Sequence, residues 1–136
     1  MSALVDEVVP SYAMATMAKV LVIDGCESVA RDRCALLARH DLPCKYATTA
    51  AGAIAVARVW QPQVVVIDLG SPQLGGFFAQ SLRDIPGLQR VCIIGITDDG
   101  SQLRRGQTGI DQFLTKSTSA DEFIDAIHAG CSQLAS

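Results

Sequence analysis

Two stretches of this 136-residue chain decide its fold: KVLVIDG at residues 19–25 and QVVVIDLGSP at residues 63–72. Each contains four consecutive apolar residues followed by an aspartate, Asp24 in the first stretch and Asp68 in the second. An apolar run without polar alternation is typical of a strand buried on both faces, as in a parallel sheet covered by helices. The two stretches therefore predict central strands that each end in a carboxylate.

The rest of the chain alternates in the same way. Further strands are predicted at residues 44–48, 91–96 and 110–115, with helices at 27–40, 49–60, near 77–83, and from Ser119 onward. Ser119 and Glu122 have the spacing of a capping box. Residues 98–109 are a weak helix candidate because Gly100 and Gly106 interrupt them. Strands alternating with helices predict a doubly wound, five-stranded parallel sheet, the flavodoxin-like (βα)5 architecture.

Composition sets the class of protein. Hydrophobic residues make up 49% and charged residues 18% of the chain, as in a globular domain. The net charge of −3 disfavours direct nucleic-acid binding. Residues 1–18 contain neither a basic leader nor a long apolar run, so we predict a flexible arm before a domain at 19–136, without membrane insertion.

The five cysteines show no C-x-x-C pair and no His/Cys ligand spacing, which disfavours structural zinc. Cys34, Cys92 and Cys131 lie within apolar patterns and are predicted to be small core residues. Reduced thiols in a cytoplasmic protein are the simplest interpretation.

Polar residues follow the predicted strands at their carboxyl ends, where open α/β sheets bind ligands. Asp24, Asp68, Thr97 and Lys116 would converge there, although singly each has an ordinary interpretation as a turn, packing or solvated residue. Together they suit phosphoryl transfer to a carboxylate. Asp68 would be the nucleophile, Mg²⁺ would be held by Asp24, Asp68 and the Gly70 carbonyl, and Lys116 and Thr97 would bind phosphoryl oxygens.

From Lys19 to about Ala129 the chain resembles the receiver domains of bacterial two-component signalling. The matching stretches are the two quoted above, VCIIGIT at residues 91–97 and GIDQFLTKS at residues 109–117. Asp68, Pro72 and Gly76 resemble the phosphoacceptor loop of that family.

The resemblance implies a role for each matching residue. Asp68 becomes the phosphoacceptor, Asp24 and the Gly70 carbonyl become metal ligands, and Thr97 becomes the switch hydroxyl. Lys116 becomes the amine that senses the phosphate. Phe113 matches an aromatic residue that reorients with the switch, with ordinary packing as an equal alternative.

The chain also departs from that family. Gly25 stands where a second acid is usual, which should weaken Mg²⁺ binding. Glu27 and Asp98 are candidate surrogate acids, against the simpler roles of stabilising a helix start and capping a turn. Ser117 replaces a common proline, and the stretch from Thr97 to Lys116 is about one helical turn shorter than usual.

The resemblance implies a phosphorylation-dependent switch rather than an enzyme with a substrate pocket. Its partners would be a histidine kinase or phosphotransfer protein and a downstream protein, and pairing of two copies stays open. The alternative is a degenerate receiver that binds proteins without phosphorylation. A flavin carrier is disfavoured because GCES, at residues 25–28, is a poor phosphate-binding loop.

Overall fold

The computed structural model describes residues 18–70, 78–98 and 109–135. In these residues one parallel sheet has the strand order β2-β1-β3-β4-β5. Its strands are β1 (Val20–Ile23), β2 (Cys44–Ala47), β3 (Val64–Asp68), β4 (Cys92–Thr97) and β5 (Gln112–Thr115). The helices are α3 (Glu27–Arg39), α4 (Ala50–Trp60), α5 (Phe78–Arg83) and α6 (Ala120–Ala135). The predicted flavodoxin-like sheet is confirmed, with its switch in strand order between β1 and β3.

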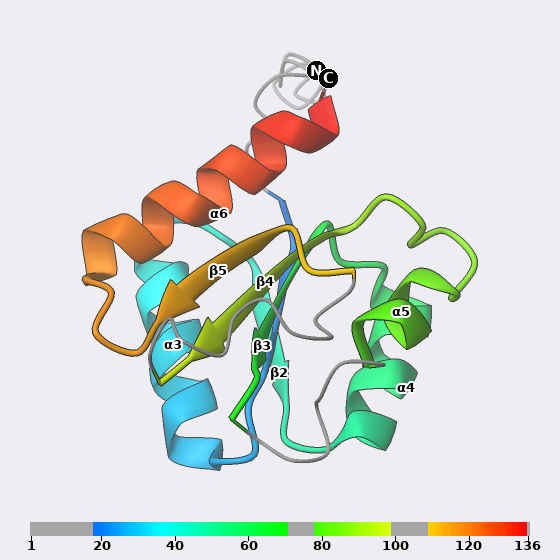
Figure 1. Ribbon diagram of the computed structural model, residues 1–136, viewed down its shortest axis with the longest axis horizontal. Helices are drawn as coiled ribbons and strands as arrows, with labels where there is room; N and C mark the ends of the chain where they lie inside the picture. The colour runs from blue at the N-terminus through cyan, green and yellow to red at the C-terminus, as the bar shows by residue number, and fades with distance from the viewer. Residues whose placement is uncertain (1–17, 71–77, 99–108, 136) are drawn as a thin grey trace, which may run out of the picture.

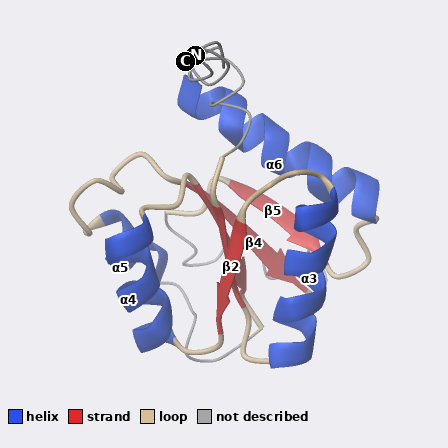
Figure 2. Ribbon diagram, turned by 180° about the vertical axis from the view of Figure 1, so that it is seen from behind, coloured by secondary structure: helices blue, strands red, loops and turns tan. Residues whose placement is uncertain are grey.

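Helices cover both faces of the sheet. Figure 1 shows α3 and α6 on one face and α4 and α5 on the other, and Figure 2 shows the same layers from behind. Alternate residues of each strand point to opposite faces. Val20 and Val22 of β1 therefore belong to the core under α3 and α6, whereas Leu21 and Ile23 belong to the core under α4 and α5. Burial on both sides explains the unbroken apolar runs.

Side chains cap the starts of two helices. Thr49 caps α4 by accepting a hydrogen bond from the Gly52 amide at 3.0 Å. Before α6, the Ser119 amide donates to Glu122 Oε1 and the Glu122 amide donates to Ser119 Oγ, both at 3.1 Å. The predicted capping box is confirmed.

Some predictions fall outside the described residues. Among them are the arm at residues 1–17, the loop residues Pro72 and Gly76, and most of the stretch 98–109. Ala18, placed at the end of the arm, is buried with the core under α3 and α6. In the parts of the chain that the structure describes, no helix is both long and apolar enough to cross a membrane.

The prediction that all cysteines are reduced is wrong for two of them. Cys34 of α3 and Cys44 of β2 form a disulfide with a Cα–Cα distance of 5.5 Å. Sequence spacing did not reveal the pair because α3 runs back along the sheet before the chain enters β2. Cys26 is an exposed thiol, whereas Cys92 and Cys131 are buried, as predicted.

Candidate functional site

Three buried polar residues end neighbouring strands. Asp24 directly follows β1, Asp68 ends β3 and Thr97 ends β4, and their exposed fractions are 2%, 7% and 5%. Because β1, β3 and β4 are adjacent and parallel, all three residues lie at the same edge of the sheet. Burying a carboxylate is unfavourable unless it is paired or hydrogen-bonded, so the partners of these groups define the site.

Lys116 supplies the cation beside Asp68. Its Nζ lies 3.6 Å from Asp68 Oδ1 and 3.5 Å from Asp98 Oδ1, and its amide donates to the Thr97 carbonyl at 2.9 Å. Partial burial alone would lower the pKa of Lys116, but the charges of Asp68 and Asp98 outweigh it and raise the pKa. The ammonium therefore stays protonated at neutral pH, where an incoming anion would meet it.

Gly70 brings the backbone close to the same carboxylate. Its amide donates to Asp68 Oδ1 at 3.0 Å. A Cβ at this position would lie 3.3 Å from Asp68 Oδ1 and 3.9 Å from Lys116 Nζ. The glycine thus leaves room beside the Asp68–Lys116 pair.

Arg33 completes the site, and sequence reasoning missed it. Its Nη1 lies 2.6 Å from Asp24 Oδ2, and the Cys26 amide donates to Asp24 Oδ1 at 2.8 Å. Arg33 lies three residues after Ala30 and four before Leu37, both of which are buried on the sheet-facing side of α3. The sequence feature that could have revealed it is an arginine at a position where helical periodicity predicts a buried apolar residue.

Of the other three predicted residues, Asp98 contacts the site, whereas Glu27 and Phe113 make other contacts. Asp98 contacts Lys116, although its side chain is 76% exposed. Glu27 is directed elsewhere, because it accepts a hydrogen bond from the Tyr46 hydroxyl and pairs with Arg31. Phe113 is half-buried on β5, paired in register with Gly95.

The donor set fits Mg²⁺ poorly. Mg²⁺ prefers an octahedron of oxygen ligands that includes one or two carboxylates. Both oxygens of Asp24 already accept hydrogen bonds, Gly25 has no side chain, and Asp68 is paired with Lys116. Within residues 18–70, 78–98 and 109–135, no three His, Cys, Asp or Glu side chains form a group that could hold a metal ion.

Solved structures with a similar fold include response-regulator receiver domains. Chemotaxis response regulator CheY4 of Vibrio cholerae superposes with a TM-score of 0.75 at 22% identity, covering 85% of this chain and 99% of that one. The Francisella response regulator 1452 receiver domain has a TM-score of 0.74 at 24% identity, covering 86% and 98%. The chain has the receiver fold.

Sequence comparison finds a curated relative over nearly the same part of this chain. Transcriptional regulatory protein KdpE of Mycobacterium tuberculosis is 30% identical over 114 residues, which are 83% of this chain. The chain spans about half the length of this curated relative. No family model matches the chain.

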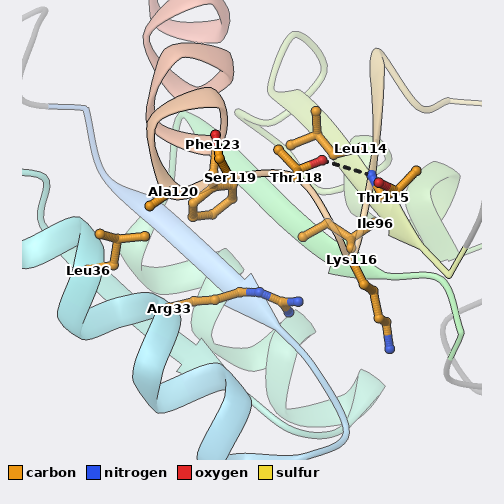
Figure 3. A pocket seen from close by; sticks show the side chains of 10 residues that line it. All are labelled: Arg33, Leu36, Ile96, Leu114, Thr115, Lys116, Thr118, Ser119, Ala120 and Phe123. Carbon is orange, nitrogen blue, oxygen red and sulfur yellow. Dashed lines mark hydrogen bonds between the residues drawn. The ribbon is translucent and has the colours of Figure 1, made fainter.

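A pocket of about 230 Å³ lies beside the receiver site, between α3, β5 and the start of α6. Arg33 and Lys116 both line it, and Figure 3 shows Arg33 coming from α3 and Lys116 from the end of β5. Phe123 and Leu36 form an apolar part of its wall. The Thr118 hydroxyl, also in the wall, accepts a hydrogen bond from the Thr115 amide at 3.1 Å and so holds the loop after β5. Two cationic side chains thus lie along one hollow at the carboxyl edge.

Proposed function

We propose that this receiver accepts a phosphoryl group on Asp68 and thereby changes its affinity for a protein partner. The observation that carries the proposal is the buried Asp68 carboxylate at the end of β3 with the Lys116 ammonium 3.6 Å away. A carboxylate nucleophile needs a nearby cation to offset the charge of the arriving phosphoryl oxygens. Lys116 is positioned for that role by the hydrogen bond of its amide to Thr97.

The donor would be a phosphohistidine on a histidine kinase or phosphotransfer protein. An Asp68 carboxylate oxygen attacks the phosphorus, the bond between phosphorus and the imidazole nitrogen breaks, and an acyl phosphate forms. The leaving imidazole takes up a proton from solvent. Hydrolysis of the acyl phosphate returns the carboxylate, so the domain is a switch rather than an enzyme acting on a separate substrate.

Receiver domains generally use Mg²⁺, and we expect this chain to bind it weakly. Asp24, Asp68 and the Gly70 carbonyl are the groups that would hold the ion, which would neutralise phosphoryl charge. The missing acid at Gly25 and the engaged oxygens of Asp24 both oppose its binding.

The response to phosphorylation would pass through Thr97 and Phe113 to a downstream protein. Thr97 ends β4 beside Asp68 and pairs in register with Thr115, one residue before Lys116. A phosphoryl oxygen that accepts a hydrogen bond from the Thr97 hydroxyl would favour one of two pre-existing conformations of this edge.

The first experiment is chemical phosphorylation followed by intact-mass measurement. We expect acetyl phosphate to add one phosphoryl group to the wild type and none to Asp68→Asn, which keeps the side-chain shape but not the nucleophile. Lys116→Met should label more slowly because it removes the cation but keeps the length of the side chain. Absence of an adduct on the wild type, with beryllofluoride also leaving the NMR spectrum unchanged, would overturn the proposal.

That outcome would favour a second candidate, a degenerate receiver that binds its partner without phosphorylation. The specific support for it is the Arg33–Asp24 pair, which occupies a carboxylate that a phosphorylated receiver would otherwise direct toward the metal. A partner that binds wild type and Asp68→Asn equally well would distinguish this module from a switch.

A further inference from the structure

The Asp24 carboxylate is fully engaged within the protein. Oδ1 accepts from the Cys26 amide at 2.8 Å, and Oδ2 accepts from Arg33 Nη1 at 2.6 Å. The side chains of Asp24 and Arg33 are only 3% and 17% exposed. The contact is therefore a largely desolvated, charge-assisted hydrogen bond rather than a surface ion pair.

The fold holds Arg33 in this position. Ala30 and Leu37, on the same side of α3, are both fully buried against the sheet. A guanidinium on this side of the helix cannot reach solvent freely, and without a partner its burial would be unfavourable. Asp24 satisfies it. The neighbouring residue Cys34 also ties this part of α3 to β2 through its disulfide.

Each of the two buried acids of the site forms an ion pair with a cationic side chain of the protein. Asp24 pairs with Arg33, and Asp68 pairs with Lys116. A divalent-metal site needs surplus negative charge, but these two pairs leave none among the buried groups. The third acid near the site, Asp98, also contacts Lys116 but is 76% exposed, so water rather than protein surrounds it. A metal ion bound to Asp24 would also lie next to the Arg33 guanidinium, and the two cations would repel each other.

We infer that Arg33 is a resident cation that takes the place of the divalent metal beside Asp24. Metal and guanidinium compete for the same carboxylate, and in the wild type the guanidinium prevails. This inference rests on the proposed function only in naming the anion that the site receives, a phosphoryl group on Asp68. Arg33 and Lys116, which line the same pocket, then provide the positive charge that a metal would otherwise supply.

The test is a Mn²⁺ titration of the unphosphorylated protein, followed by water-proton relaxation, with Mg²⁺ as competitor. Arg33→Gln removes the charge but keeps hydrogen-bonding capacity. Removing a positive charge that contacts the carboxylate removes its repulsion of a bound metal ion. We therefore expect Mn²⁺ binding to strengthen by about tenfold or more in Arg33→Gln.

The controls come from the same helix and the same carboxylate. Arg31→Gln removes an arginine whose side chain is 62% exposed and pairs with Glu27, so it should leave Mn²⁺ affinity unchanged. Adding Asp24→Asn to Arg33→Gln should abolish the gain, because the acid that would bind the metal is gone. A folded Arg33→Gln variant with wild-type Mn²⁺ affinity would overturn the inference.

A second measurement uses the wild type alone and does not depend on the variant folding. We expect the NMR signal of the Cys26 amide, which donates to Asp24, to stay unchanged on addition of millimolar Mg²⁺. A saturable shift would show that the metal displaces Arg33, contrary to the inference. Neither readout requires phosphorylation, so failure of Asp68 to accept a phosphoryl group would leave these results interpretable.

Discussion

At the scale of single residues, the surroundings of each thiol decide its reactivity. Burial, and then the charge of Asp111, raise the pKa of Cys92 to about 11. Cys26 is exposed, and hydrogen bonds from the Ser28 hydroxyl and the Val29 amide lower its pKa. Because the thiolate is the reactive form, two chemically identical side chains should behave very differently in the folded protein.

We expect iodoacetamide at mildly alkaline pH to modify Cys26 much faster than Cys92. With a pKa of about 11, Cys92 has very little thiolate under these conditions, and its side chain is also shielded from the reagent. Peptide mass mapping without reductant would measure both rates in one sample, and urea-unfolded protein provides the control. Equal rates in the native protein would contradict this assignment of the two environments.

At the scale of elements, the disulfide joins helix α3 to strand β2. Cys34 and Cys44 are separated by 10 residues, and the turn between them includes Asp41 at a positive φ of 60° and the buried Leu42. The bond restricts the unfolded chain by closing this short loop. It also holds the helix that carries Arg33 against the sheet.

We expect reduction of this disulfide to lower the free energy of unfolding by roughly 2–3 kcal/mol, the loop-closure value for about ten residues. Urea unfolding of the wild type with and without reductant would measure the change. The double variant Cys34→Ser/Cys44→Ser should unfold near the reduced wild type and should not respond to reductant. An unchanged wild-type midpoint on reduction would contradict the stabilising role of the bond.

At the scale of the whole molecule, a glycine sets the distance between α6 and the sheet. A Cβ on Gly130 would lie 2.7 Å from Cys92 Sγ, 3.3 Å from Cys92 Cβ and 3.6 Å from Val64 Cγ2. Ile127 and Cys131, on the same helix, are buried in the core under α3 and α6. Close approach of α6 is therefore needed to bury its apolar face over β3 and β4.

We expect Gly130→Ala to destabilise the fold. Overpacking costs about 1–3 kcal/mol, and with an overlap as close as 2.7 Å we expect it to exceed the roughly 1 kcal/mol that alanine contributes to helix propensity over glycine. In a Cys92→Ala background the Sγ atom is absent, so the same substitution should become neutral or stabilising. Urea unfolding of the four proteins of this cycle would measure the coupling, and equal costs in both backgrounds would contradict it.

The strands and their polar ends could be predicted from local patterns. Unbroken apolar runs indicated strands that are buried on both faces. In a parallel sheet the carboxyl ends of the strands lie at one edge, so the residue that follows each run was expected at that edge. Asp24, Asp68 and Thr97 are buried at that edge, and Lys116 pairs with Asp68 there. The capping box before α6 was likewise readable because its two hydrogen bonds join residues three apart.

The sequence by itself therefore determined the class of fold and the edge of the sheet at which Asp24, Asp68, Thr97 and Lys116 lie. Only the tertiary structure decided which cation faces which acid and which cysteines join. The Arg33–Asp24 pair depends on how α3 is rotated about its axis, and the Cys34–Cys44 bond depends on where that helix crosses β2. Periodicity encodes which face of an element is buried, but packing against the sheet selects the atoms that this face meets.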